Sequence, residues 1–364
     1  MIQAQFQSWD IRNNTVLVRA DLNVPLSHKT ILSDFRLKAF EPTLHALIKQ
    51  HARVIIATHL GNPSGPDAAY STQLLIPWFI DRGYAITYAP DIATAHTMVH
   101  NPLILLENLR FFPGEKEGDV SFARILAQLG DYYVNDAFGV LHRSDASVTH
   151  VPALFAPTHR SCGLLVEKEL RMLAPIALTP ERPYVCILGG SKPHTKLPLI
   201  THLLPRVDTL ALLPGLSNTY EACQQHPIGT SLHKILLPLD YQISSPVLSN
   251  TTRIIDAHAV QQEDIIISIG PKTVTQLQKA IATANTIVMN GLPGFAELPS
   301  TMDSAHALLT AVTDSRAYTV LCGGDSIARA QEYKVLSRFT YVSTGGGATI
   351  TYLAGQPLPG LRYL

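Results

Sequence analysis

The chain has 364 residues, more than one hydrophobic core usually serves, so its length predicts two domains. Lys and Arg together number 28, as do Asp and Glu, and this balance excludes the global positive field that recruits nucleic acid or an anionic membrane. The four cysteines lie far apart and form no CxxC pair, which favours reduced thiols in a cytoplasmic protein without a metal cluster.

In the N-terminal half, short apolar runs alternate with helical patterns. The apolar runs predict strands at residues 15–19, 53–58, 85–88, 103–106 and 132–134. Ser33 is expected to cap a helix with a kink at Pro42, whose apolar face carries Leu37, Phe40, Leu44, Leu47 and Ile48. This alternation predicts an α/β fold with a mainly parallel sheet and right-handed crossovers.

Polar side chains recur just past the ends of these predicted strands. They are Asp21 and Asn23 after the first strand, His59 after the second, Arg110 after the fourth, and His142 with Arg143 after the fifth, together with Arg36 at the helix start. Guanidinium forks match phosphate and carboxylate oxygens, so convergence of these groups on one face predicts an anion site. The two histidines lack metal-ligand spacing, so we expect them to donate hydrogen bonds. For any single arginine, a solvated surface charge is the alternative.

The stretch at residues 186–196, CILGGSKPHTK, is a second candidate for phosphate binding. An apolar run at 184–188 ends at Gly189 and Gly190, and Lys192 and Lys196 follow. We interpret it as a buried strand whose carboxyl end presents two ammonium groups and backbone N–H groups to a polyanion. Ligands bind at such strand ends in open α/β sheets. An ordinary strand–loop–helix corner with solvated lysines is the alternative.

Strands and helices alternate again in the C-terminal half. The patterns predict strands at 208–213, 234–237, 264–269, 286–289, 319–322 and 339–342, and helices at 273–284 and from Lys196 under a Thr195 cap. Two glycine loops also follow predicted strands. In Gly323-Gly324-Asp325-Ser326, the carboxylate suits Mg²⁺ and the hydroxyl suits a phosphate oxygen. The loop at 345–347 opens a helical pattern and suits an anion, although each loop is equally compatible with a tight turn.

Eight blocks of the sequence resemble those of the phosphoglycerate kinase family, in the family's order. They are VLVRADLNVP, DFRLKAFEPT, THLGNP, LLENLRF, VNDAFGVLHR, ILGGSKPHTK, VSTGGGA and LPG. The resemblance covers essentially the whole chain and implies two Rossmann-like three-layer domains with mainly parallel sheets, joined by a hinge helix. It implies a phosphoglycerate-binding domain at 1–165 with a C-terminal tail at 352–364, the helix at 166–180, and a nucleotide-binding domain at 181–351.

The resemblance also implies a reaction and its residues. The reaction is reversible phosphoryl transfer between 1,3-bisphosphoglycerate with ADP and 3-phosphoglycerate with ATP, carried out by a monomer that uses Mg²⁺. The residues implied for the transferring group are Arg36, Lys192, Lys196 and Gly346. Those implied for phosphoglycerate are Asp21, Asn23, Arg36, His59, Asn62, Arg110 and Arg143. Those implied for the nucleotide are Lys196, Asn290, Glu297, Gly323, Gly324, Asp325 and Ser326, with Asp325 also on Mg²⁺.

The chain departs from the family pattern at several positions. Asn62 stands where the pattern has arginine, Ser268 where it has aspartate, Met289 and Leu292 alter a loop usually led by tryptophan, Pro193 and His194 lie between the two lysines, and only Gly215 remains of a glycine group at the adenine pocket. Two alternatives to an active phosphoglycerate kinase therefore stay open. One is a nucleotide-binding protein with weak or no turnover, and the other is a kinase for another acyl phosphate.

Overall fold

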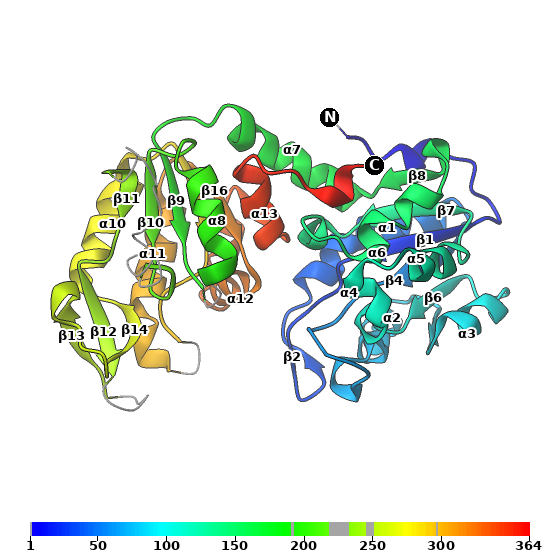
Figure 1. The fold of residues 1–364 in the computed structure, drawn as a ribbon, viewed down its shortest axis with the longest axis horizontal. Helices are drawn as coiled ribbons and strands as arrows, with labels where there is room; N and C mark the ends of the chain where they lie inside the picture. Colours follow the sequence, from blue (N-terminus) through cyan, green and yellow to red (C-terminus); the bar gives the residue numbers. More distant parts are fainter. Residues whose placement is uncertain (1, 191–192, 218–232, 245–250, 296–297) are drawn as a thin grey trace. The chain divides into compact units, whose positions relative to one another are not determined.

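The computed structural model describes residues 2–190, 193–217, 233–244, 251–295 and 298–364 (Figure 1). The chain divides into two compact units, each built around a parallel six-stranded sheet. The first unit comprises Met1–Met172 and Pro357–Leu364, so the C-terminal residues return to it, and the second comprises Leu173–Gln356. No helix in the described part of the chain has the length and hydropathy of a transmembrane segment.

The first unit has a sheet with strand order β5-β6-β4-β1-β7-β8, and all of its strand pairs are parallel. The strands are β1 (Thr15–Ala20), β4 (Arg53–Ala57), β5 (Ile86–Ala89), β6 (Leu103–Leu106), β7 (Tyr132–Asp136) and β8 (Arg160–Cys162), with a separate hairpin of β2 (Leu26–Ser27) and β3 (Thr30–Ile31). The helices are α1 (Phe35–Lys49), α2 (Ile76–Asp81), α3 (Ile92–Thr97), α4 (Pro113–Glu117), α5 (Val120–Ala127), α6 (Ala146–Thr149) and the first part of α7 (Leu164–Leu178).

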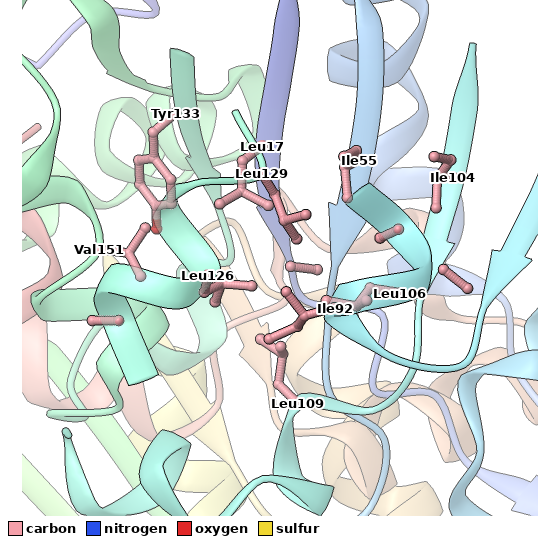
Figure 2. Close-up of a cluster of buried hydrophobic side chains, with 14 of the residues drawn as sticks. Leu17, Ile55, Ile92, Ile104, Leu106, Leu109, Leu126, Leu129, Tyr133 and Val151 are labelled. Atoms are coloured by element: carbon pink, nitrogen blue, oxygen red, sulfur yellow. The ribbon is translucent and has the colours of Figure 1, made fainter. Parts of the chain in front are cut away.

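A buried apolar cluster holds helices against one face of this sheet (Figure 2). Leu17 of β1, Ile55 of β4 and Ile104 of β6 extend from adjacent strands and are no more than 1 % exposed, and Leu126 and Ile92 pack with them from α5 and α3. The strands read as nearly continuous apolar runs because helices cover a parallel sheet on both faces. This core fixes the strand ends, and therefore the residues that follow them.

Helix α1 begins one residue later than its sequence suggests. Its N-cap position is Asp34, one residue after the Ser33 expected from the sequence. The Asp34 side chain makes no cap hydrogen bond, because its carboxylate accepts from Trp78 Nε1 and pairs with Lys38. The helix continues to Lys49 with Pro42 inside it. The N-terminus of α1 consequently carries Arg36 at its first turn.

Helix α7 begins in the first unit and ends in the second. Asp136, the last residue of β7, accepts hydrogen bonds at Oδ1 from the N–H groups of Leu165 and Val166, at 2.9 and 3.1 Å. These bonds satisfy two of the backbone donors that every helix N-terminus leaves exposed. The first turn of α7 is thereby tied to the carboxyl edge of the sheet.

The second unit repeats the architecture with strand order β11-β10-β9-β15-β16-β17, again parallel throughout. The strands are β9 (Tyr184–Leu188), β10 (Thr209–Leu212), β11 (Ile235–Leu236), β15 (Thr286–Asn290), β16 (Tyr318–Cys322) and β17 (Tyr341–Ser343). The helices are α8 (Pro193–Leu203), α10 (Pro271–Thr283), α11 (Asp303–Asp314), α12 (Gly324–Glu332) and α13 (Gly347–Leu353). The fold-class prediction of two mainly parallel α/β sheets is confirmed.

One strand predicted in the second unit is present but lies outside the main sheet, and one predicted helix cap is wrong. The strand expected at 264–269 is β14 (Ile265–Ile269), which joins β12 (Asp240–Ser244) and β13 (Arg253–Asp256) in a separate antiparallel sheet of order β13-β12-β14. Helix α8 begins at Pro193, so Thr195 lies inside the helix and does not cap it. Proline is favoured at a first helical position, where its missing N–H has no intrahelical partner to lose.

Candidate active site

In the first unit, the candidate residues extend from one edge of the sheet. Strands β1, β4, β6 and β7 are parallel, so the segments after Ala20, Ala57, Leu106 and Asp136 all leave at their carboxyl ends. These segments carry most of the residues that the sequence singled out. The prediction that they share one edge follows from the register of a parallel sheet.

A fully buried arginine, Arg19, lies under this edge. Its Nε donates to Ser147 Oγ at 2.7 Å, its Nη1 donates to the Ala20 carbonyl, and its Nη2 lies 3.2 Å from His59 Nδ1. Glu115 lies 3.8 Å from Nη2 and accepts from the N–H and hydroxyl of Ser147. Sequence reasoning missed this network, although an arginine within the apolar run of β1 was a detectable signal.

His59 is a buried neutral imidazole beside Arg19. A guanidinium only donates, so His59 Nδ1 must accept from Arg19, and the imidazole proton resides on Nε2. Burial lowers the pKa of His59 well below its usual value, and surrounding guanidinium groups lower it further. The arginines with this effect are Arg19, Arg110, Arg143 and Arg36. The three arginines predicted from the sequence therefore gather around His59.

Asp21 holds Arg36 at the mouth of this cluster. Arg36 Nη1 donates to Asp21 Oδ1 at 3.0 Å and to the Asn23 carbonyl at 3.2 Å, and its side chain is 21 % exposed. Asn23 Oδ1 accepts from the N–H of Gly61 at 2.8 Å, which joins the β1 loop to the β4 loop. Asp21 and Asn23 thus orient a partly exposed guanidinium.

Arg110 has the most unusual environment of these residues. It belongs to a 3₁₀ helix, Leu109–Phe111, and is 5 % exposed. Its Nη1 donates to the Gly61 carbonyl, while its Nε and Nη2 have no hydrogen-bond partner among the described residues. Burial, followed by the charge of Arg143, lowers the pKa of Arg110 to about 10. A buried cation with two unmade hydrogen bonds is costly unless an anion completes it.

Arg143 and His142 complete the basic face, and Asn62 lies at its edge. Arg143 and His142 are half-buried, whereas Asn62 is exposed. Burial and the charge of Arg143 lower the pKa of His142 to about 4, so His142 is neutral near pH 7. Its Nδ1 has no partner among the described residues, like Asp145 Oδ2 nearby. The face therefore presents several cations and an unused imidazole nitrogen.

In the second unit, glycine loops meet at the carboxyl edge of the other sheet. The N–H of Gly189 donates to the Asn290 carbonyl at 2.8 Å. Gly291 has a φ of +96°, and a Cβ there would lie 2.6 Å from the carbonyl carbon of Gly189, so this crossing requires glycine at position 291. A Cβ at Gly346 would lie 3.8 Å from the Gly323 Cα, so the loops after β16 and β17 are also neighbours.

The side chains of Asn290 and Ser326 hydrogen-bond to the backbone of neighbouring segments at this edge of the sheet. Asn290 Nδ2 lies 3.3 Å from the Cys322 carbonyl, and Ser326 Oγ accepts from the N–H of Gly291 at 3.0 Å. Both residues are no more than 5 % exposed. These contacts shape the backbone around Gly323 and Gly324, and the predicted role of all four residues in binding the nucleotide remains a prediction.

Asp325 is exposed in the first turn of α12, beside Gly324, whose Cβ position meets no atom within 4 Å. No group of three or more potential metal ligands occurs among the described residues. Mg²⁺ commonly takes one or two carboxylates and completes its shell with substrate phosphates and water, so a single exposed carboxylate at this edge fits that ion.

Three predicted residues cannot be placed in full. Lys192 and Glu297 lie outside the described residues, as does the side chain of Lys196, whose backbone belongs to α8. Ser268, a departure from the family pattern, is buried on β14 with its Oγ 2.7 Å from Ser304 Oγ. Met289 is also fully buried, so both altered residues contribute to packing.

Comparison with known proteins identifies the family. The phosphoglycerate kinase family model matches residues 6–356. The chain belongs to the phosphoglycerate kinase family. A phosphoglycerate kinase of Pelotomaculum thermopropionicum is 36% identical over 385 residues, covering 98% of this chain and 97% of its own, and one of Borrelia hermsii is 33% identical over 394 residues, covering 98% of each chain.

Solved phosphoglycerate kinase structures share the fold. The structure from Pyrococcus horikoshii OT3 has a TM-score of 0.84 at 27% identity, and that from Coxiella burnetii has a TM-score of 0.77 at 29% identity. Each comparison covers 100% of this chain and 98% of the other. The family predicted from the eight sequence blocks is therefore confirmed, and the domain and residue assignments remain predictions.

Proposed function

We propose that this protein catalyses the phosphoglycerate kinase reaction of glycolysis and gluconeogenesis with the residues described above. The reaction is the reversible transfer of a phosphoryl group between 1,3-bisphosphoglycerate with ADP and 3-phosphoglycerate with ATP. One observation carries the assignment of the first unit: buried Arg110 has two hydrogen-bond donors that nothing in the described chain occupies, beside Arg36, Arg143 and His59. A phosphorylated carboxylic acid supplies the oxygens that these donors lack.

Residues 1–165 with 352–364 would hold phosphoglycerate. Arg110, Arg143 and His59 Nε2 would donate to its oxygens, and Asp21 and Asn23 would hold Arg36 in position, as their hydrogen bonds support. Arg36 is the most exposed part of that pair and would face the group being transferred. The carboxylate of 3-phosphoglycerate is itself the nucleophile, so the protein needs to orient it and balance charge rather than supply a strong base.

Residues 181–351 would bind the nucleotide, with 166–180 as the connecting helix. Lys192 and Lys196 would neutralise phosphate charge, and the open space beside Gly324 gives phosphates room to approach. For Asn290, Glu297, Ser326 and Gly346, the family resemblance is the support. Asp325 would hold Mg²⁺, which supplies charge neutralisation for the phosphates when bound.

The alternative of a binding protein without turnover is not favoured, since family membership extends over nearly the whole chain and Arg36 keeps its Asp21 partner. We further propose that the protein works as a cytoplasmic monomer.

Asn62 is exposed at the edge of the basic face. Asparagine in place of the family's arginine at this position removes one possible substrate contact and leaves the buried cluster around Arg110 and His59 intact.

The test is a coupled assay with 3-phosphoglycerate and MgATP on the wild type, Arg36→Ala and Lys196→Ala. Turnover should occur in the wild type and vanish in Arg36→Ala. Lys196→Ala should lose most turnover yet bind 3-phosphoglycerate normally in calorimetry. A folded wild type that binds MgATP without turnover would refute the proposed activity, and equal loss of turnover and phosphoglycerate binding in Lys196→Ala would refute the division of roles between the units.

A further inference from the structure

A lysine on helix α4 lies against the loop that contains Asn62. The Lys116 ammonium donates to the Pro63 carbonyl at 3.4 Å. On the other side of Asn62, Arg110 Nη1 donates to the Gly61 carbonyl. Two cations from one segment of chain, the 3₁₀ helix of Arg110 and the following α4, therefore flank the same exposed asparagine.

The Lys116 ammonium keeps most of its bonding capacity. An ammonium has three N–H groups, and the Pro63 carbonyl uses one of them. Within the described part of the chain, no carboxylate lies within ion-pair distance of Lys116, whereas the neighbouring Glu115 faces inward toward Ser147 and Arg19. Lys116 is exposed, so it keeps its positive charge accessible to a ligand.

The spacing of the two contacts suits one small anion. Gly61 and Pro63 are two residues apart, so their carbonyls are separated by at most about 7 Å. The Nε and Nη2 atoms of Arg110 are without partners in the described chain. An anion bound there would therefore lie beside the loop on which Lys116 is held.

We propose that Lys116 is a phosphoglycerate-binding residue, supplying beside Arg110 the positive charge that Asn62 does not. This inference rests on the proposed function, since it takes phosphoglycerate as the ligand of the Arg110 cluster. Lys116 rotates about the Pro63 contact and places one of its remaining N–H groups on a ligand oxygen. The residue determines substrate affinity and takes no part in the transfer itself, so its loss should raise KM for 3-phosphoglycerate and spare kcat.

The experiment compares Lys116→Ala, Lys116→Gln and Lys116→Arg with Lys49→Ala. Lys49 is exposed in the last turn of α1, which ends at the amino edge of the sheet, so it matches the charge change away from the site. Lys116→Ala and Lys116→Gln should each raise KM for 3-phosphoglycerate about tenfold, the size of one charge-assisted hydrogen bond. Their KM for MgATP, kcat and melting temperature should match the wild type, and Lys116→Arg and Lys49→Ala should resemble the wild type throughout.

A second arm tests compensation within the loop. Asn62→Arg in the Lys116→Ala background should return KM to within about threefold of the wild type, since it restores one cation beside Arg110. Wild-type affinity in Lys116→Gln would mean that the side chain only supports the Pro63 carbonyl, and parallel falls in kcat and melting temperature would mean a structural role. Either result would overturn the proposal.

Calorimetric titration with 3-phosphoglycerate alone separates this proposal from the proposed activity. Weaker binding by Lys116→Ala than by Lys49→Ala supports the role of Lys116 even if the wild type shows no turnover. Equal binding by the two variants refutes it even if the wild type is an active kinase.

Discussion

Replacing Arg110 with methionine should separate two effects of this side chain. One is the destabilisation that its buried charge causes in the ligand-free protein, and the other is its contribution to phosphoglycerate binding. In the ligand-free protein, Arg110 is buried with two unpartnered donors among the described residues, and its pKa is lowered from 12.5 to about 10, first by burial and then by Arg143. Methionine keeps an unbranched apolar stem and carries no charge. Arg110→Met should therefore leave the ligand-free protein at least as stable as the wild type.

The magnitude follows from two contributions, the cost of the buried charge and the loss of one hydrogen bond. The lowered pKa of Arg110 corresponds to a destabilisation of the charged side chain by about 3 kcal/mol without screening. Arg36 and Arg143 are partly exposed, so solvent screening reduces this cost to about 1–2 kcal/mol. The lost bond to the Gly61 carbonyl costs about 1 kcal/mol. The free energy of unfolding should thus stay level or rise by up to about 1 kcal/mol, whereas breaking a well-paired buried ion pair costs about 3–5 kcal/mol.

Urea unfolding with and without 3-phosphoglycerate measures both effects. At a ligand concentration of about 100 times Kd, the wild type should gain about 2.7 kcal/mol of stability. Arg110→Met should lose nearly all of this gain, because the loss of two charge-assisted bonds weakens binding by about 100-fold or more. Arg12→Met, at an exposed arginine, is the control and should behave as the wild type. A ligand-free Arg110→Met protein destabilised by more than about 2 kcal/mol, or one that keeps the ligand effect, would refute the reasoning.

Two further predictions concern pH and the glycine loops. Burial raises the pKa of Asp136 to about 7 from 3.8, so the folded protein binds more protons between these values and loses stability as the pH rises from about 4 to 7. Asp136→Asn should flatten this part of the pH profile of the unfolding free energy, and an unchanged slope would contradict the assignment. Gly291→Ala should cost about 2 kcal/mol or more in thermal unfolding, because its Cβ would meet Gly189 at 2.6 Å. Gly324→Ala, with open space at its Cβ, should keep the melting temperature but raise KM for MgATP several-fold, and a destabilised Gly324→Ala would contradict this contrast.

Much of the candidate site was predictable because its signals are local. Glycines at strand ends, lysines after an apolar run and the order of the eight blocks all depend on neighbours in sequence. The convergence of Arg36, Arg110 and Arg143 also followed, since parallel strands bring their carboxyl ends to one edge. The local rules placed the start of α1 one residue too early, since its N-cap is Asp34, whose carboxylate binds Trp78 and Lys38, and not Ser33.

By itself, the sequence determined the family, the two parallel sheets and the residues at their carboxyl edges, because periodicity and motif order survive in a linear chain. Only the tertiary structure decided which of those side chains have hydrogen-bond or ion-pair partners within the described chain. It buried Arg19 against Ser147 and Glu115, left Arg110 Nε and Nη2 without partners in the described chain, and brought Lys116 to the loop of Asn62. Hydrogen bonding, burial and the resulting pKa values depend on atoms far apart in the chain, so they become defined only once the strands and helices have packed.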